Sequence, residues 1–386
     1  MSPQLTIVLP LKGRPAFTLR FLWHANACRM PYHFLIADGQ VQAALAELLS
    51  NSKEIFPNLN IEYVRYPNDI SFTRYFVKMS DVLSRVRTPY VMLADNDDFL
   101  APTGIDGSLE FLERSSDYVC CGGGIAGFSI YSPPGMANPG LRGPLNKLSF
   151  RYAKEDRSQD LGQTLLVDRL VAGSQYSWGF YAVYRTAALA QVWREVVEID
   201  FSDLMLCEWF CGMRTLTLGK ACSKSSTIGY MRQYWTSMRS SFSEDWVHHL
   251  LRSRFTEDFT TLIDRLSKVI SQADGIDAAD AGERLRQTFD GWYRGFLRHN
   301  YGPSGIVRQY LRENMPAFLM WLKTRRRYGV LFERKRLLAE LFRQGASSKY
   351  LDEFRREVAA LTDVLTGDDF SAFLRSHISA IAHGQP

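Results

Sequence analysis

The chain has 386 residues, of which 46% are hydrophobic and 23% charged, an ordinary balance for a globular protein with a buried core. The net charge of +5 is too small to indicate nucleic-acid binding, and no run approaches the roughly 18 apolar residues that a membrane-spanning helix needs. The six cysteines show no disulfide framework, since Cys120 and Cys121 are adjacent, and the N-terminus lacks a secretory-signal pattern. We therefore expect a reduced, cytoplasmic protein.

Strand and helix patterns alternate through the first part of the chain. Apolar β-branched runs and helically spaced apolar positions predict, in order, a strand at 5–10, a helix from Phe17, a strand at 32–37, a helix through 45–49, a strand at 61–64, a helix at 72–86 and a strand from Tyr90. Strands that alternate with helices in this way form mostly parallel sheets. We expect an α/β fold with a Rossmann-like, mostly parallel sheet flanked by helices.

The middle of the chain is less regular. Residues 122–143 are rich in glycine and proline, a composition that predicts loops rather than long elements. Aromatic and β-branched residues predict a strand over 178–184, and helical spacing predicts a helix over 204–218 that ends at Gly219. A strand through Ile228 is expected to follow.

The sequence changes character at about residue 243. Beyond it lie long helical patterns with few β-branched clusters, so we expect an α/β domain over 1–242 and an all-helical domain over 243–386. In the helical domain, the basic segments 323–327 and 333–336 flank an apolar stretch, a pattern that suits contact with the inner face of the cytoplasmic membrane. A homo-oligomer contact, an acceptor contact or an ordinary helical bundle with solvated cations fits the same pattern.

Three carboxylates follow the apolar strand that begins at Tyr90. Asp95, Asp97 and Asp98 lie within four positions, and unpaired carboxylates so close together repel one another and raise each other's pKa. A divalent cation removes that cost, and oxygen ligands suit Mg²⁺ or Mn²⁺, which in turn bind phosphates. Because ligands of open α/β sheets bind beyond the carboxyl ends of the strands, the cluster predicts a metal and diphosphate site. The alternative is a solvated acidic turn.

The succession of strand, Asp-Gly turn, helix, strand, helix, strand and acidic cluster resembles that of GT-A fold glycosyltransferases, in particular glycosyltransferase family 2 and related bacterial polysaccharide-cluster transferases. The resemblance covers about residues 5–235, and its sharpest part is Asp95 to Asp98, which looks like the family's DXD motif. It implies that Asp97 coordinates the metal that bridges the donor's diphosphate. Asp95 would contact the ribose or complete the metal shell.

The resemblance also implies contacts to the rest of a nucleotide-sugar donor. Asp38 stands where the family places a carboxylate that receives an N–H of the base, although the family often has two acids there; a UDP-sugar is favoured, and an ordinary turn residue is the alternative. Lys12 and Arg14 lie in the loop that surrounds the nucleobase. Lys78, on the helix before the acidic strand, and Arg232, near the end of the matched region, would meet the diphosphate, unless Lys78 is an ordinary surface cation.

An inverting transferase needs a carboxylate that takes the proton of the acceptor hydroxyl. The family supplies it near the start of a helix that ends in a glycine turn, which leaves Glu208 and Asp203 as candidates, with Glu208 favoured by its spacing from Gly219. The alternative is that one of them caps the helix while the other is a solvated helical acid. The aromatic residues Trp178 and Tyr181 are candidates for stacking on a sugar.

The sequence therefore predicts a metal-dependent, inverting glycosyltransferase that moves a sugar from a nucleotide-diphosphate sugar to a saccharide or lipid-linked acceptor, as in surface polysaccharide synthesis. Two alternatives stay open. One is a scaffold that binds sugar nucleotides through a degenerate transferase domain. The other is a sugar nucleotidyltransferase, which would need a longer glycine-rich loop than the Lys12–Pro15 segment.

Overall fold

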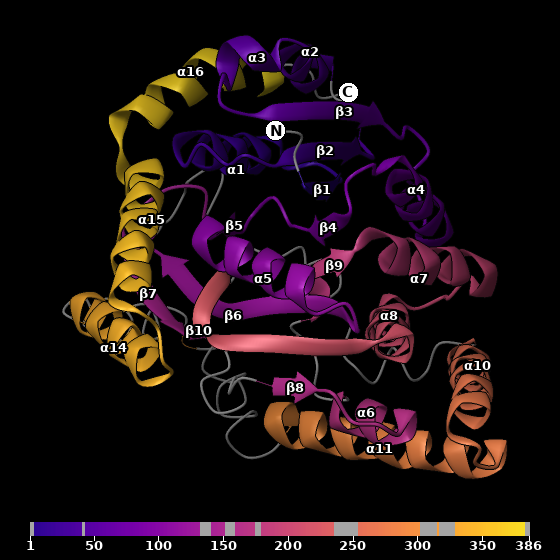
Figure 1. The fold of residues 1–386 in the computed structure, drawn as a ribbon. Coiled ribbons are helices and arrows are strands. Elements are labelled where there is room, and N and C mark those ends of the chain that lie inside the picture. The colour runs from indigo at the N-terminus through magenta and orange to yellow at the C-terminus, as the bar shows by residue number, and fades with distance from the viewer. Residues whose placement is uncertain are drawn as a thin grey trace.

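A broad β-sheet with helices packed around it forms the centre of the protein (Figure 1). The computed structural model describes residues 4–40, 43–131, 140–150, 159–173, 179–234, 254–301, 315 and 329–382. Within these residues ten strands join in one sheet, whose main path runs β3-β2-β1-β4-β9-β6-β10-β5, with β7 on β6 and β8 on β10. The predicted α/β fold with a mostly parallel central sheet is confirmed.

The elements alternate along the chain much as the sequence predicts. The strands are β1 (Leu5–Leu11), β2 (His33–Asp38), β3 (Asn60–Arg65), β4 (Tyr90–Leu93), β5 (Phe99–Leu100), β6 (Tyr118–Ile130), β7 (Leu145–Phe150), β8 (Gln159–Leu161), β9 (Val183–Arg185) and β10 (Lys220–Gln233). The helices are α1 (Pro15–Ala27), α2 (Ala43–Ser50), α3 (Ser52–Ile55), α4 (Phe72–Arg85), α5 (Pro102–Arg114), α6 (Leu166–Gly173), α7 (Thr186–Ile199), α8 (Leu204–Leu218), α10 (Phe255–Asp274), α11 (Ala278–Tyr301), α14 (Gly329–Arg343), α15 (Ser348–Thr366) and α16 (Asp368–Ala382), with a 3-10 turn η1 at Gly179–Tyr181.

The parallel strands β3, β2, β1 and β4 bring their carboxyl ends to one edge of the sheet. Their register pairs Leu11 with Asp38 and Val8 with Leu93. The loops that follow β1, β2 and β4 therefore begin side by side. In an open α/β sheet this edge is where ligands bind. The register alone therefore brings together the loops that carry predicted contacts to the nucleotide-sugar donor.

The prediction of loops over 122–143 is wrong for residues 122–130, which belong to the long buried strand β6. Its glycines serve close packing rather than turns. A Cβ on Gly123 would lie 2.5 Å from the backbone nitrogen of Gly229 on β10, and one on Gly127 would collide with the ring of Tyr234. Residues 132–139 lie outside the described part of the chain.

The predicted strand over 178–184 is also only partly right. Trp178 lies outside the described residues, and Gly179–Tyr181 form the 3-10 turn η1 before β9 begins at Val183. The predicted helix over 204–218 is confirmed as α8, and the strand after it, β10, extends to Gln233.

The described C-terminal helices pack onto the α/β part in two groups, visible on two sides of Figure 1. Helices α10 and α11 pack against α6 and α8, whereas α14 packs on β7 and β10, and α15 and α16 pack on α1. Both groups contribute to the same buried apolar cluster as the sheet. The division at residue 242 stays a prediction, because residues 235–253 lie outside the described part.

Carboxylates fasten each of these groups to helix starts in the α/β part. At the end of α10, Asp274 accepts hydrogen bonds from the backbone N–H groups of Leu166 (2.7 Å) and Val167 (2.8 Å), where α6 begins. On α15, Glu357 accepts bonds from the backbone N–H of Thr103 (2.8 Å) and from its hydroxyl (2.6 Å), in the first turn of α5. Each carboxylate thus satisfies donors that the helix itself cannot.

None of the described helices is both long enough and apolar enough to cross a membrane. The basic segment 323–327 lies outside the described residues. The segment 333–336 belongs to α14, where Lys335 and Arg336 are exposed.

Candidate functional site

The three predicted acids meet in the short loop between β4 and β5. Oxygen atoms of Asp95, Asp97 and Asp98 lie within 4.8 Å of one another, and only 7% of Asp97 and 2% of Asp98 is exposed. Burial, and next the charge of Asp97, raises the pKa of both Asp95 and Asp98. Three converging carboxylates are the donor set that Mg²⁺ or Mn²⁺ prefers, so the residues present fit such an ion. A solvated acidic turn does not describe this cluster.

Side chains and backbone from the far half of the sheet hold the acidic loop in place. The Tyr181 hydroxyl donates to the Asp95 carboxylate (2.8 Å), and the Asp95 backbone N–H donates to the Tyr230 hydroxyl (3.0 Å). The two tyrosine rings stack at 4.2 Å between centroids. The backbone N–H of Gln233 donates to Asp98 (2.7 Å). The orientation of the acids is therefore set by η1 and β10, not by β4 alone.

Two arginines of α1, one at its N-cap and one in its middle, reach the same loop. Arg14 donates to the Asp97 carboxylate (3.0 Å), and its guanidinium lies 3.9 Å from the centroid of the Phe17 ring. Its backbone is left-handed (φ 58°), an unusual conformation for a residue other than glycine that often marks a functional site. Arg20 is fully buried and donates to the backbone carbonyls of Asp97 and Gly140. Burial lowers the pKa of Arg20 to about 9.

Arg232 completes the positive charge around the acids. Its guanidinium lies 5.2 Å from the centroid of the Tyr181 ring, and its charge opposes the rise in the pKa of Asp95 and Asp98. The structure thus brings together Arg14 and Arg232, predicted from separate ends of the α/β region, at one acidic loop.

A second charged cluster lies at the ends of β1 and β2. Lys78 on α4 is buried, forms an ion pair with Asp69 and donates to the backbone carbonyl of Leu11 (3.2 Å). Burial lowers its pKa. Lys12 is exposed next to this cluster, and its charge lowers the pKa of Lys78 further. Lys78 is therefore not a surface cation of the helix; it links α4 to the strand edge.

Asp38 lies at the same edge with both carboxylate oxygens engaged. One accepts from the Tyr63 hydroxyl (2.6 Å), and the other accepts from the backbone N–H of Gln40 (3.0 Å). Burial raises the pKa of Asp38, against these bonds and the nearby charge of Lys78. Each carboxylate oxygen can accept a further hydrogen bond, although only 1% of Asp38 is exposed.

The two candidates for the base have different environments. Asp203 is fully buried at the start of α8, where it accepts from the backbone N–H groups of Met205 (2.8 Å) and Leu206 (3.2 Å). Glu208 is exposed on the same helix and lines a cavity. Asp203 was predicted to be either the base or a cap of the helix. The structure shows it in the capping arrangement.

Glu208 and the acidic loop face a common neighbour. Burial, followed by charges that include those of Asp95 and Glu208, raises the pKa of Tyr75 well above its ordinary value. Tyr75 packs edge-on against Trp193, with ring centroids 5.9 Å apart. The carboxylates of Asp95 and Glu208 therefore both lie near Tyr75.

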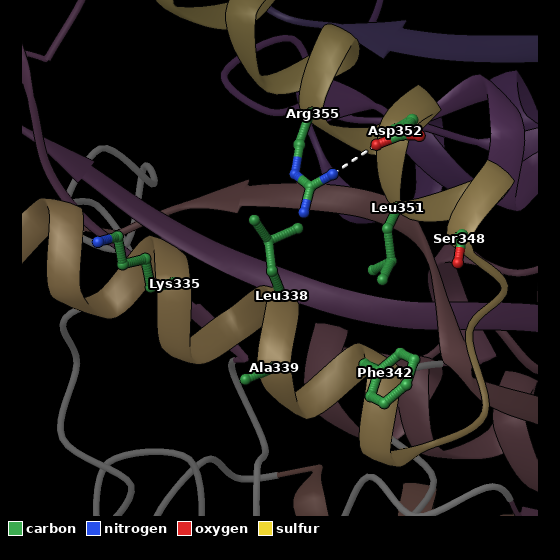
Figure 2. A pocket seen from close by; sticks show the side chains of 8 residues that line it. All are labelled: Lys335, Leu338, Ala339, Phe342, Ser348, Leu351, Asp352 and Arg355. Atoms are coloured by element: carbon green, nitrogen blue, oxygen red, sulfur yellow. Dashed lines mark hydrogen bonds and ion pairs between the residues drawn. The ribbon is translucent and has the colours of Figure 1, made fainter.

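A separate groove lies between α14 and α15 (Figure 2). Its volume is about 440 Å³, and Figure 2 shows Leu338 and Phe342 of α14 facing Leu351 and Arg355 of α15. Phe342 is 64% exposed. None of the residues predicted for the site lines this groove.

The sequence did not reveal several residues that build the site. For Arg20 the sequence contains one indication of a buried role: it stands between Leu19 and Phe21 in a helix whose neighbouring positions are apolar. For Tyr230 and Gln233 the sequence contains no such indication, because their contacts depend on how β10 pairs with β5 and β6.

No protein-family model and no curated protein matches this sequence. Among solved structures, S. aureus TarS is 11% identical with a TM-score of 0.46; the match covers 94% of this chain but only 54% of that one, so this chain spans about half of TarS. A shorter TarS chain in complex with UDP gives 11% identity and a TM-score of 0.46, covering 96% of this chain and 91% of that one. Mannosyltransferase PcManGT from Pyrobaculum calidifontis, in complex with GDP-Man and Mn²⁺, gives 12% and 0.37, covering 81% and 85%. Likeness at this level carries no chemistry.

Proposed function

We propose that the chain is a metal-dependent glycosyltransferase that moves a sugar from a nucleotide-diphosphate sugar to a hydroxyl group. The observation that carries this proposal is the group of three carboxylates whose oxygens converge within 4.8 Å at the strand edge. Asp97 and Asp95 would hold Mg²⁺ or Mn²⁺, which would neutralise the charge that develops on the departing diphosphate.

Positively charged side chains of the protein would stabilise the same departing diphosphate. Arg14 and Arg232 are positioned around the acids, and preorganised cations that face developing negative charge lower the barrier without reorganising. Arg20 is a positioning residue, because it bonds to the backbone of the loop rather than reaching the site.

The nucleoside would bind along the neighbouring strand ends. Asp38 would accept an N–H of the base, and Lys78 and Lys12 supply positive charge at the same edge. A uridine or guanosine nucleotide fits an acceptor at Asp38, because uracil and guanine each carry a ring N–H, and a UDP-sugar is the donor we favour.

Glu208 is the proposed base of an inverting reaction. Glu208 is exposed, whereas Asp203 is a helix cap, and moving Asp203 would leave the N–H groups of Met205 and Leu206 without their acceptor. Glu208 takes the proton of the acceptor hydroxyl as the sugar leaves the diphosphate. Saccharide or lipid-linked acceptors of surface polysaccharide synthesis are the proposed context.

The proposal is tested by measuring Mn²⁺-dependent hydrolysis of a panel of UDP- and GDP-sugars. The folded wild-type chain should hydrolyse at least one of them, and Asp97→Ala should lower the rate at least about a hundredfold. Glu208→Gln should lower the same hydrolysis rate about 10² to 10⁴-fold, because water takes the place of the acceptor hydroxyl, while nucleotide binding is kept. Asp264→Ala, an exposed acid on α10, is the control and should change nothing.

Two results would contradict the proposal. Hydrolysis that survives Asp97→Ala would place the chemistry elsewhere. A folded chain that binds nucleotide sugars but turns over none would favour the scaffold.

A further inference from the structure

Two cysteines lie directly opposite each other on neighbouring strands, Cys121 on β6 and Cys222 on β10. The register is regular around them, with residues 221–224 paired to 120–123 in order. Neighbouring strands are about 4.8 Å apart, within the Cα separation of about 4.4–6.8 Å that a disulfide bond spans. Residues paired in this way project to the same face of the sheet, and the two thiols form a hydrogen bond. The pair is therefore placed to form a disulfide with little movement of either strand.

The hydrogen bond distinguishes the two sulfur atoms. The thiol of Cys121 lowers the pKa of Cys222, and the charge of Lys224 acts in the same direction, while burial and the charge of Asp160 oppose both. The same hydrogen bond, followed by burial, raises the pKa of Cys121. A thiol that loses its proton readily is the one that reacts with an oxidant, and a second thiol beside it can complete a disulfide. The structure thus gives Cys222 the first of these parts and Cys121 the second.

The groups around the pair come from three elements. Lys224, two residues beyond Cys222 on β10, donates to a backbone carbonyl of α5 (3.0 Å). Asp160 on β8 is the antiparallel partner of Cys222, and Ser108 on α5 hydrogen-bonds to Cys121. Cys121 is fully buried, whereas Cys222 is only partly buried. Cys222 is therefore the sulfur that a small oxidant meets first.

Other cysteines of the chain lack this combination. Cys28 is also partly exposed, but burial and the charge of Glu357 raise its pKa to about 12. Cys207 on α8 is buried, and burial raises its pKa well above the ordinary value. Because the thiolate rather than the thiol is the nucleophile, both should react slowly.

We propose that Cys121 and Cys222 are a redox-active pair, which hydrogen peroxide converts to a disulfide and an external dithiol reopens. The Cys222 thiolate attacks one peroxide oxygen, the O–O bond breaks, hydroxide leaves, and Cys222 becomes a sulfenic acid. Cys121 then gives up its proton, and its sulfur attacks that of Cys222. The S–S bond forms as hydroxide leaves. With the protons of the two thiols, one peroxide becomes two waters.

The disulfide would join the strand that supports the acidic loop to its neighbour. On β10, the Tyr230 hydroxyl accepts from the backbone N–H of Asp95, and the backbone N–H of Gln233 donates to Asp98. The pair lies in the first part of the same strand. Oxidation would therefore fasten β10 to β6 without using any residue of the acidic loop.

The test treats the folded full chain with hydrogen peroxide, blocks the remaining thiols with iodoacetamide and maps the peptides by mass spectrometry. A linked Cys121–Cys222 peptide should form and should disappear with dithiothreitol. Without peroxide, iodoacetamide should modify Cys222 at least about tenfold faster than Cys28, the matched partly exposed cysteine. In Cys121→Ser, peroxide should leave a sulfenic acid on Cys222 that dimedone traps, whereas Cys28→Ser should form the linked peptide as the wild type does.

The wild-type measurements decide the proposal even where Cys121→Ser does not fold. A wild-type chain that yields no linked peptide overturns the redox-active pair. Modification of Cys28 as fast as Cys222 overturns the assignment of Cys222 as the reactive thiol. Neither readout involves nucleotide sugars, so the pair and the proposed transferase activity stand or fall separately.

Discussion

Carboxylates hold structure in two regions of the molecule, the strand edge with Asp95, Asp97 and Asp98 and the seam where Asp274 and Glu357 of the C-terminal helices meet α6 and α5, but the two regions satisfy them differently. At the edge, the half-buried Asp95 and the buried Asp98 lie beside Asp97, and desolvation and mutual repulsion raise the pKa of both. At the seam, Asp274 and Glu357 accept hydrogen bonds from backbone N–H groups where helices begin.

The difference concerns what each arrangement can do. Carboxylates at a helix start meet donors that would otherwise be unpaired, and at Asp274 this stabilises the fold. At Glu357 the burial of the charge works against this gain, since it raises the pKa of that carboxyl. Carboxylates that face each other weaken the fold until a cation joins them, so they provide a binding site. The same residue type therefore holds the helices in one region and is kept available for a ligand in the other.

The largest stability change is expected at the seam. Asp274→Ala should destabilise the chain by about 2 kcal/mol, because the first two N–H groups of α6 lose a charged acceptor. Urea denaturation measures the change. Asp264→Ala on the same helix, an exposed acid, should shift the midpoint by less than about 0.5 kcal/mol. Equal effects of the two substitutions would show that the capping contact contributes nothing.

Glu357 makes the seam sensitive to pH. Burial, with the charges of Asp106 and Glu353, raises the pKa of Glu357 from 4.5 to about 7, while the bonds from Thr103 oppose that rise. A carboxyl whose pKa is higher in the folded than in the unfolded chain binds its proton more tightly when folded. Its contribution to stability is therefore complete below pH 4.5 and is lost as the pH rises through about 7.

Glu357→Gln should remove that dependence. The amide oxygen still accepts from Thr103, and no charge has to be buried, so the variant should be more stable than the wild type at pH 8 and similar to it at pH 5. Thermal melting at pH 5, 6, 7 and 8 tests this, with Glu113→Gln, an exposed acid on α5, as the control. A pH profile that is unchanged by Glu357→Gln would contradict the assignment.

The smallest stability effect is expected at the strand edge. Asp97→Asn loses a partly exposed ion pair with Arg14, worth about 0–1 kcal/mol, but relieves repulsion on Asp95 and Asp98. The free energy of unfolding should stay within about 0.5 kcal/mol of the wild type or increase. A loss as large as that in Asp274→Ala would remove the contrast between the two regions.

The sequence predicted the strand edge well because local patterns determine it. Continuous apolar runs identify β1, β2 and β4 as buried parallel strands, and residues at or just beyond their carboxyl ends, such as Asp38 and Asp95, must share an edge. The acidic loop could be predicted without knowing which residues far away in the sequence contact it.

Elements that depend on distant packing were missed. The glycines of β6 indicated turns, whereas their role is to let β10 and Tyr234 approach closely. The seam was not predicted either, since Glu357 and Thr103 are 254 positions apart. For Asp203 and Glu208 the sequence offered two arrangements, and only the hydrogen bonds at the start of α8 identify the cap.

The central claim is that the acidic cluster holds a cation that binds a nucleoside diphosphate. Isothermal titration calorimetry with UDP and with GDP, each in Mn²⁺ and in EDTA, tests it directly on the wild type and on Asp97→Asn. The account predicts binding of at least one nucleotide in Mn²⁺, none in EDTA, and none in Asp97→Asn under either condition. Binding of equal affinity with and without metal, or unchanged by Asp97→Asn, would contradict it.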